Sequence, residues 1–263
     1  MSLSNDILDY ILSFLQSDLV TLKTCAKSHP TLSKLSERYI YAEVTLCDDR
    51  DTEGIRSSEF TEIVDKSPDI AKHVRSLTVL VVHGTLLEEY VPHVHVVRVA
   101  CLLPMFSGLT DLKIKGIDRS NCFGWPELPV MFQEAFLNFL HTRGKKTVTI
   151  CRSSCFPLSL LNDCENVTMD HCKDTQYDKE STKDALLPCP GPFERLSLLR
   201  CSRACLESTV AWLQRHSLHS LEFDGEWAID DVGVFLPRAL VACSNSLTKL
   251  CLDIGILCTS SID

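Results

Sequence analysis

Apolar residues recur with two different periods along this chain of 263 residues. In residues 3–46 they fall three or four positions apart, as on the buried stripe of a helix. From residue 74 onward they follow a short template, apolar-x-x-apolar-x-apolar, whose last two positions alternate as on a strand with one buried face. The pattern predicts a helical module over residues 1–46 and a different architecture over residues 47–263.

The first module is predicted to form three short helices with tight connections. Ser4 can cap the first helix and Asp18 the second, which ends before Pro30. The third helix carries Leu32 and Tyr39 on its apolar stripe. The stripe of the first helix is wide, comprising Leu3, Ile7, Leu8, Ile11, Leu12, Phe14 and Leu15. So small a bundle cannot bury this stripe by itself, which indicates a partner surface or a neighbouring domain.

Residues 3–15 (LSNDILDYILSFL), then Asp18-Leu19 and Leu22, then residues 25–29 (CAKSH), resemble an F-box. The family pattern is roughly L-P-x-E-I-L-x-x-I-L-x-x-L, then D-L-x-x-L, then V-[CS]-[KR]-x-[WF]. Ser4 stands where the family usually has Pro, and His29 where it usually has an aromatic residue. The resemblance implies binding to a Skp-type adaptor, and through it to a cullin, by Leu3, Ser4, Ile7, Leu8, Ile11, Leu15, Asp18, Leu19 and Leu22.

The second region is a degenerate repeat. Full copies of the template begin at Val74, Leu109, Cys164, Phe193, Leu218 and Leu247, and a weaker copy begins at Lys145. Their central positions lie 19 to 36 residues apart, near the period of leucine-rich repeats. Residues 43–46 are predicted to begin the stack. Helical stripes fill residues 132–140, 206–213 and 232–243, with Asp230 or Asp231 capping the last.

Strand-then-helix units of this kind bury their apolar faces by stacking side by side. The expected fold class is therefore α/β, with parallel strands on one side and helices outside. It resembles the irregular leucine-rich-repeat solenoid that follows an F-box in fungal-type proteins. Two polar segments, residues 48–59 and 173–184, are predicted to be exposed loops. The second is either a recognition loop or a solvated insertion.

Composition limits the partners and the cellular compartment that the sequence predicts. The chain has 26 Lys and Arg against 35 Asp and Glu, a net charge of −9, and no basic stripe for nucleic acid. No apolar run approaches the roughly 20 residues that a membrane helix needs. The 14 Cys lie in a long Leu/Val-rich chain whose first residues do not resemble a signal peptide. These features predict free thiols in a reducing compartment, the cytoplasm or the nucleus.

Cysteine and histidine supply the candidate chemistry. No tight C-x-x-C pair occurs, so neither a zinc site nor any cofactor is expected. Cys172 and Cys201 follow Met169 and Leu198 by three residues, where such repeats turn a small side chain inward, and are predicted to be structural thiols. His93 and His95 would share a strand face, as metals prefer, but a scattered surface pair is the favoured interpretation. No nucleophile elbow, P-loop or other catalytic signature occurs.

Two tryptophans and the end of the chain leave alternatives open. Trp125 and Trp227 each follow a template copy, and each is either an exposed anchor for a partner or a packing residue. The copies run to Leu252 without a clear polar cap, which leaves truncation, dimerisation and a makeshift tail open.

The resemblance implies a substrate-recognition adaptor of a Skp–cullin–F-box ubiquitin ligase, which holds an unknown protein substrate on its solenoid and performs no bond chemistry. The alternative is an interaction scaffold of the same repeats without a ligase, which the departures at Ser4 and His29 favour. A third hypothesis, a Cys-dependent or zinc-dependent enzyme, requires a bound metal or a hyper-reactive thiol.

Overall fold

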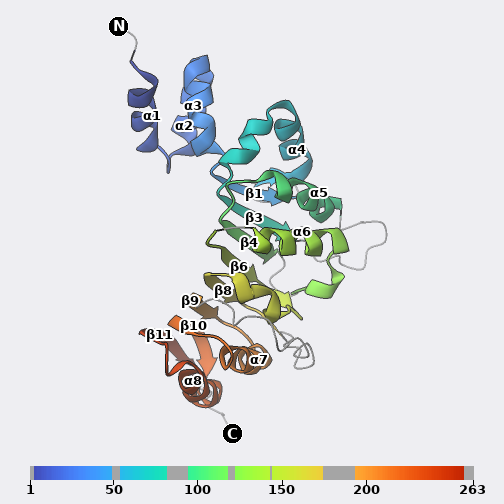
Figure 1. The fold of residues 1–263 in the computed structure, drawn as a ribbon, viewed down its shortest axis with the longest axis vertical. Helices are drawn as coiled ribbons and strands as arrows, with labels where there is room; N and C mark the ends of the chain where they lie inside the picture. Colours follow the sequence, from blue (N-terminus) through green and yellow to red (C-terminus); the bar gives the residue numbers. More distant parts are fainter. Residues whose placement is uncertain are drawn as a thin grey trace.

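The computed structural model describes residues 3–48, 54–81, 94–117, 122–142, 144–173 and 193–257. Three helices come first: α1 (Asn5–Ser13), α2 (Leu19–Ser28) and α3 (Pro30–Ile40). A curved, parallel sheet follows, and the described residues give it nine strands in the order β11-β10-β9-β8-β6-β4-β3-β1-β2. The expected α/β class with a large parallel sheet is confirmed (Figure 1).

The strands of the large sheet are β1 (Glu43–Cys47), β2 (Ile55–Arg56), β3 (Ser76–Val81), β4 (Asp111–Gly116), β6 (Thr147–Cys151), β8 (Asn166–Asp170), β9 (Phe193–Leu199), β10 (Leu218–Ala228) and β11 (Lys249–Leu257). A small second sheet pairs β5 (Phe123–Gly124) with β7 (Ser153–Ser154). The longer helices are α4 (Ser57–Lys66), α5 (Val94–Leu102), α6 (Val130–His141), α7 (Arg203–Leu213) and α8 (Ile229–Cys243). Short 3-10 helices are η1 (Pro68–His73), η2 (Leu103–Met105), η3 (Trp125–Glu127) and η4 (Leu158–Asp163). Helices α4 to α8 lie along one face of the large sheet (Figure 1).

Local chemistry sets the ends of the first three helices. Ser4 stands at the N-cap of α1 in extended conformation, without a side-chain hydrogen bond. The Asp18 carboxylate caps α2 by accepting from the Thr21 N–H at 3.0 Å. Pro30 opens α3 at a position where a missing N–H costs nothing. The prediction of three short helices with these boundaries is confirmed.

The helices join the sheet directly. Residue 42 accepts hydrogen bonds from the N–H groups of Arg75 and Ser76 at 2.9 and 3.0 Å, so the segment after α3 is tied to the start of β3. β1 then pairs with β3. The predicted module boundary at residue 46 therefore falls inside a strand of the sheet, and the helices themselves end at Ile40.

The strand pairing places equivalent template positions side by side. The central positions form one row across the sheet: Val44, Leu77, Leu112, Val148, Val167, Leu196, Leu221 and Leu250. All but Leu250, on the last strand, are at most 3% exposed. The unequal spacing of the copies does not disturb this register, because the extra residues lie in the connections. In the weaker copy Lys145 is exposed, and Lys146 is buried instead, with Nζ donating to the Leu109 carbonyl at 3.0 Å.

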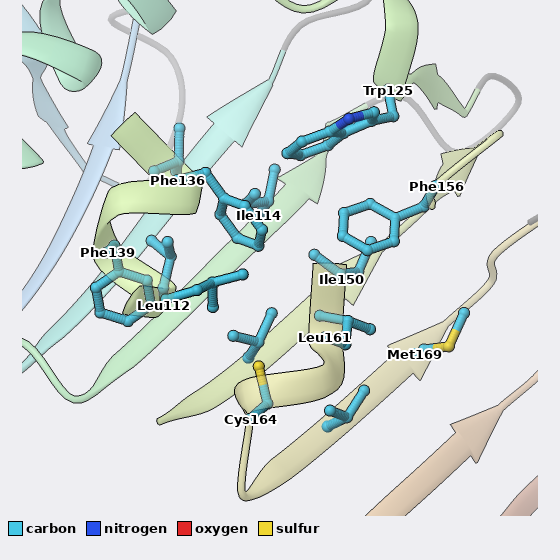
Figure 2. Close-up of a cluster of buried hydrophobic side chains, with 14 of the residues drawn as sticks. Leu112, Ile114, Trp125, Phe136, Phe139, Ile150, Phe156, Leu161, Cys164 and Met169 are labelled. Atoms are coloured by element: carbon cyan, nitrogen blue, oxygen red, sulfur yellow. The ribbon is translucent and has the colours of Figure 1, made fainter. Parts of the chain in front are cut away.

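The inner face of the sheet packs against the helices through large side chains. Figure 2 shows Leu112, Ile150 and neighbouring strand residues together with aromatic rings from α6 and the adjoining connections. The Trp125 ring lies 5.1 Å from Phe136 and 4.8 Å from Phe156, between ring centroids, and Trp125 is 4% exposed. Of the two alternatives for Trp125, the structure supports packing. The side chain of Trp227 lies outside the described residues.

Four details differ from the sequence predictions. α8 begins at Ile229, so Asp230 and Asp231 lie inside the helix and not at its N-cap position. α4 begins at Ser57, inside the segment 48–59 predicted as a loop; residues 49–53 of that segment lie outside the described ones. His95 lies on α5 and is 1% exposed, so the interpretation as a surface residue is wrong. His93 and residues 174–184 lie outside the described residues.

Candidate protein-interaction surfaces

Helices α1 and α2 present large apolar side chains to solvent. We call this set the N-terminal apolar face, and its members, between 45% and 77% exposed, are Leu3, Ile7, Tyr10, Ile11, Phe14, Leu19 and Val20. The α1 members recur every three or four residues, so they form one continuous stripe along the helix. Exposed apolar stripes of this kind mark interaction sites in soluble proteins.

The residues that the F-box resemblance implied as adaptor contacts differ in how far the fold exposes them. Leu3, Ile7, Ile11 and Leu19 lie on the N-terminal apolar face. Leu8 and Leu15 are half-buried. Leu22 is fully buried, as is Leu12, so in this conformation its side chain holds the helices together and offers no surface to a partner. Ser4 and Asp18 are exposed caps.

Two aromatic residues enlarge the face beyond the residues implied. Tyr10 and Phe14 contact each other edge to face, with ring centroids 4.9 Å apart, and are 66% and 68% exposed. Exposed aromatic side chains are the residues that most often dominate binding energy at interfaces. The sequence signal that could have added Tyr10 and Phe14 to the implied contacts is their i, i+4 spacing, which places both on one side of the helix.

Polar contacts fix α1 against α3. Arg38 forms an ion pair with Asp9, and the Tyr39 hydroxyl donates to the same carboxylate at 3.2 Å. The Arg38 guanidinium also lies 4.9 Å from the centre of the Tyr39 ring. The apolar stripe of α1 is therefore held in one orientation relative to α3 and to the sheet that follows it.

The second surface is the face of the large sheet opposite the helices, which we call the open face. Successive strand residues point to opposite sides, so every residue between two buried ones lies here. Its middle row is Thr45, Thr78, Lys113, Thr149, Thr168, Ser197, Glu222 and Cys251. The row toward the strand ends is Leu80, Lys115, Cys151, Asp170, Leu199, Asp224 and Asp253, of which Leu80 and Cys151 are buried. The open face is thus mostly polar, with short hydroxyl side chains between charged ones.

Some charges on the open face have partners within the chain. Glu222 accepts hydrogen bonds from the Ser197 hydroxyl at 2.6 Å and from Arg195 Nε at 3.2 Å, and these bonds lower the pKa of the Glu222 carboxyl. Asp170 accepts from His171 Nδ1 at 2.7 Å and lies 3.4 Å from Arg200. The centre of the open face is therefore electrostatically self-contained.

Buried thiols line the turns at the strand ends. Cys172 Sγ donates to the Ile150 carbonyl at 3.4 Å, and Cys201 Sγ donates to the Met169 carbonyl at 3.3 Å, each reaching the preceding strand. The residues before them, His171 and Arg200, have φ values of 52° and 50°. This left-handed turn is what directs each thiol inward. As predicted, both side chains turn inward, and both are buried and bonded to the backbone.

Among the described residues, the remaining cysteine and histidine side chains do not gather into a metal site. Burial raises the pKa of Cys164 to about 12, which keeps that thiol protonated. No disulfide joins any two of the twelve cysteines within the described ranges. In the same part of the chain, His, Cys, Asp and Glu side chains form no group of three able to hold a metal ion.

Comparisons of the chain with protein-family models, with curated proteins and with solved structures give no match. Among the helices that the structure describes, none has the length and apolar character needed to cross a membrane.

Proposed function

We propose that this protein is a substrate receptor of a Skp–cullin–F-box ubiquitin ligase, with an F-box-like helical module followed by a leucine-rich-repeat-like solenoid. The N-terminal apolar face carries this proposal. It contains Leu3, Ile7, Ile11 and Leu19, which the resemblance implied as adaptor contacts. The buried Leu12 and Leu22 account for the stability of the helices, so the exposed residues require another explanation. A partner surface supplies it.

The sheet supports the second half of the proposal. One template position fills one buried row from Val44 to Leu221, as expected of stacked repeats. The inward-turning Cys172 and Cys201 occupy the same place in two successive units and bond the preceding strand. These features favour an irregular solenoid whose open face holds the substrate.

The proposed mechanism is positioning. A receptor that binds the adaptor at one end and a substrate at the other makes their encounter intramolecular, which raises the effective concentration of the substrate near the ligase. This requires a fixed geometry between the two surfaces. The hydrogen bonds from Arg75 and Ser76 to residue 42, together with the Tyr41 ring packed 6.2 Å from Phe60, supply a stiff connection. No side chain of the receptor needs to perform chemistry.

The test is binding of the full chain to a purified Skp-type adaptor, measured by calorimetry. The double variant Ile11→Ser and Phe14→Ser removes two exposed apolar side chains, 47% and 68% exposed, without touching the buried ones. We expect at least a tenfold loss of affinity, because buried apolar anchors at interfaces are each worth about 2 kcal/mol or more. Val241→Ser, which removes a side chain 76% exposed on α8, is the matched control and is expected to bind normally.

The alternative is a scaffold that binds partners without a ligase. One observation favours it: His29 is exposed and its Nδ1 accepts from the Thr31 N–H at 3.1 Å. This residue caps α3, whereas the aromatic residue usual in the family would anchor the helix by packing. A folded full chain that fails to bind the adaptor would support this alternative and refute the proposed ligase role.

A further inference from the structure

The open face carries two lysines, Lys113 and Lys115, for which the described residues supply no side-chain partner. Lys113 and Lys115 lie two residues apart on β4, so both point to the open face, and both are half-buried. Within the described ranges neither forms a hydrogen bond or an ion pair with another side chain. On the neighbouring strand β6, Thr149 is in register with Lys113 and Cys151 with Lys115. Asp111 lies on the same face of β4, two residues before Lys113, so positive charge exceeds negative charge there in a chain of net charge −9.

Two carboxylates mark the other end of the same face. Asp224 on β10 and Asp253 on β11 are in register, and both are exposed. Like charges on adjacent strands repel each other, so this pair is unfavourable unless a cation compensates it. In the part of the chain that the structure covers, neither carboxylate has a side-chain partner. The charged residues between the two ends are compensated, because Asp170 contacts His171 and Glu222 contacts Arg195.

The separation of the two ends can be worked out from the strand order. β4 and β10 are separated by β6, β8 and β9, which makes four strand spacings. At about 4.8 Å per spacing the ends lie about 19 Å apart, the length of about six residues of extended chain. Between them lie the short side chains of Thr149, Thr168 and Ser197, together with Cys151, Asp170 and Leu199 in the neighbouring row.

We propose that the open face binds an extended segment of a partner protein, in which acidic residues and basic residues are separated by about six positions. The acidic residues contact Lys113 and Lys115, and the basic residues contact Asp224 and Asp253. The segment crosses the strands, and the hydroxyls of Thr149 and Thr168 face its backbone. This inference rests on the proposed role of the open face as the substrate surface and specifies the charge pattern of that substrate.

Charge complementarity favours a protein segment over nucleic acid. A phosphate backbone is uniformly negative, so it would gain contacts at Lys113 and Lys115 but would be repelled by Asp224 and Asp253. A uniformly basic segment faces the opposite conflict. A segment of mixed charge satisfies both ends at once, and the correct spacing then provides specificity.

The test uses the full chain and a fluorescent synthetic peptide with two Glu near one end, two Lys about six residues away, and Ser, Gly and Thr between them. Fluorescence anisotropy at low salt measures its affinity. We expect Lys113→Glu with Lys115→Glu, and separately Asp224→Lys with Asp253→Lys, each to weaken binding about tenfold. The variant that carries all four reversals is expected to regain binding, because the peptide then binds in the opposite direction.

The control is Lys66→Glu with Lys72→Glu, which makes the same change of charge at side chains 79% and 65% exposed outside the open face. This variant is expected to bind the peptide normally. An all-acidic peptide that binds as tightly as the mixed one would overturn the inference, as would equal weakening by the control variant. Adaptor binding is measured on the same samples. A chain that binds adaptor but no peptide refutes this inference alone, and one that binds peptide but no adaptor refutes the ligase role alone.

Discussion

Phe156 offers the sharpest test of how the sheet and helices are held together. It is fully buried, and its ring centroid lies 4.8 Å from Trp125 and 6.1 Å from Phe136. The three rings meet in edge-to-face arrangements above the strands (Figure 2). Phe156→Ala removes the ring that contacts both others, and leaves a cavity between the sheet and α6.

The magnitude follows from burial. Replacing a fully buried Phe by Ala costs about 3 to 5 kcal/mol, which combines lost transfer energy with the cavity. Each lost aromatic contact contributes about 0.5 to 1.5 kcal/mol, and Phe156 loses two, so the upper part of that range applies. Because a domain is stable by only about 5 to 15 kcal/mol, the variant forfeits a large share of its stability.

Urea denaturation followed by circular dichroism measures the difference. We expect the free energy of unfolding to fall by about 4 kcal/mol, with an unchanged dependence on urea concentration. Phe14→Ala is the matched control: the same change at a side chain 68% exposed is expected to alter stability by less than about 0.5 kcal/mol. A loss below about 1 kcal/mol for Phe156→Ala would refute the packing described for these rings.

Three further outcomes are expected. Burial lowers the pKa values of His95 and His216, so the unfolded chain binds more protons than the folded one in mildly acidic solution. We therefore expect the free energy of unfolding to be highest above about pH 7 and to decrease below about pH 6.5. Urea titrations on both sides of this range measure the difference. Iodoacetamide is expected to modify the exposed Cys101 in the folded protein but to leave Cys164, with its pKa raised to about 12, unmodified until denaturation, as peptide mass spectrometry would show. Asp18→Ala removes the cap of α2 and is expected to lower the thermal midpoint of unfolding.

A specific result would contradict each of these three predictions. A stability that stays constant between neutral and mildly acidic pH would mean that the two histidines are not held neutral. Equal rates of alkylation at Cys101 and Cys164 would contradict the burial of the second thiol. Asp18→Asn is the matched control for the cap, because an amide oxygen can also accept from the Thr21 N–H. If it lowers the midpoint as much as alanine does, capping is not the cause.

The elements that sequence periodicity predicted well are those with one buried side. The strand template and the stripes of α6 and α7 alternate apolar and polar positions, so their period is visible. α5 was not predicted because its exposed side also carries apolar residues, Val94 and Cys101, so the sequence shows no clear helical period. α4 was missed because polar composition outweighed its Phe60 and Val64 stripe.

The candidate surfaces were predicted in part for the same reason. The stripe of α1 follows from residue spacing, but which of its leucines remain exposed depends on packing against α3, as the contrast between Ile11 and Leu12 shows. The charge pattern of the open face required the register. Asp224 and Asp253 each follow the central position of their copy by three residues, so the template relates them, but only the pairing of β10 with β11 shows that they are neighbours.

The side chains on the two faces of the sheet are subject to different physical constraints. Inner positions such as Leu112 and Leu196 must be apolar, because they fix the register and fill the core. Open-face positions between them, such as Lys113 and Thr149, contribute little to that core, so the side chains there can differ from strand to strand without altering the fold. Binding specificity can then be encoded on the open face independently of stability. The same separation holds in α1, where the buried Leu12 maintains the helix packing and the exposed Phe14 remains available to a partner.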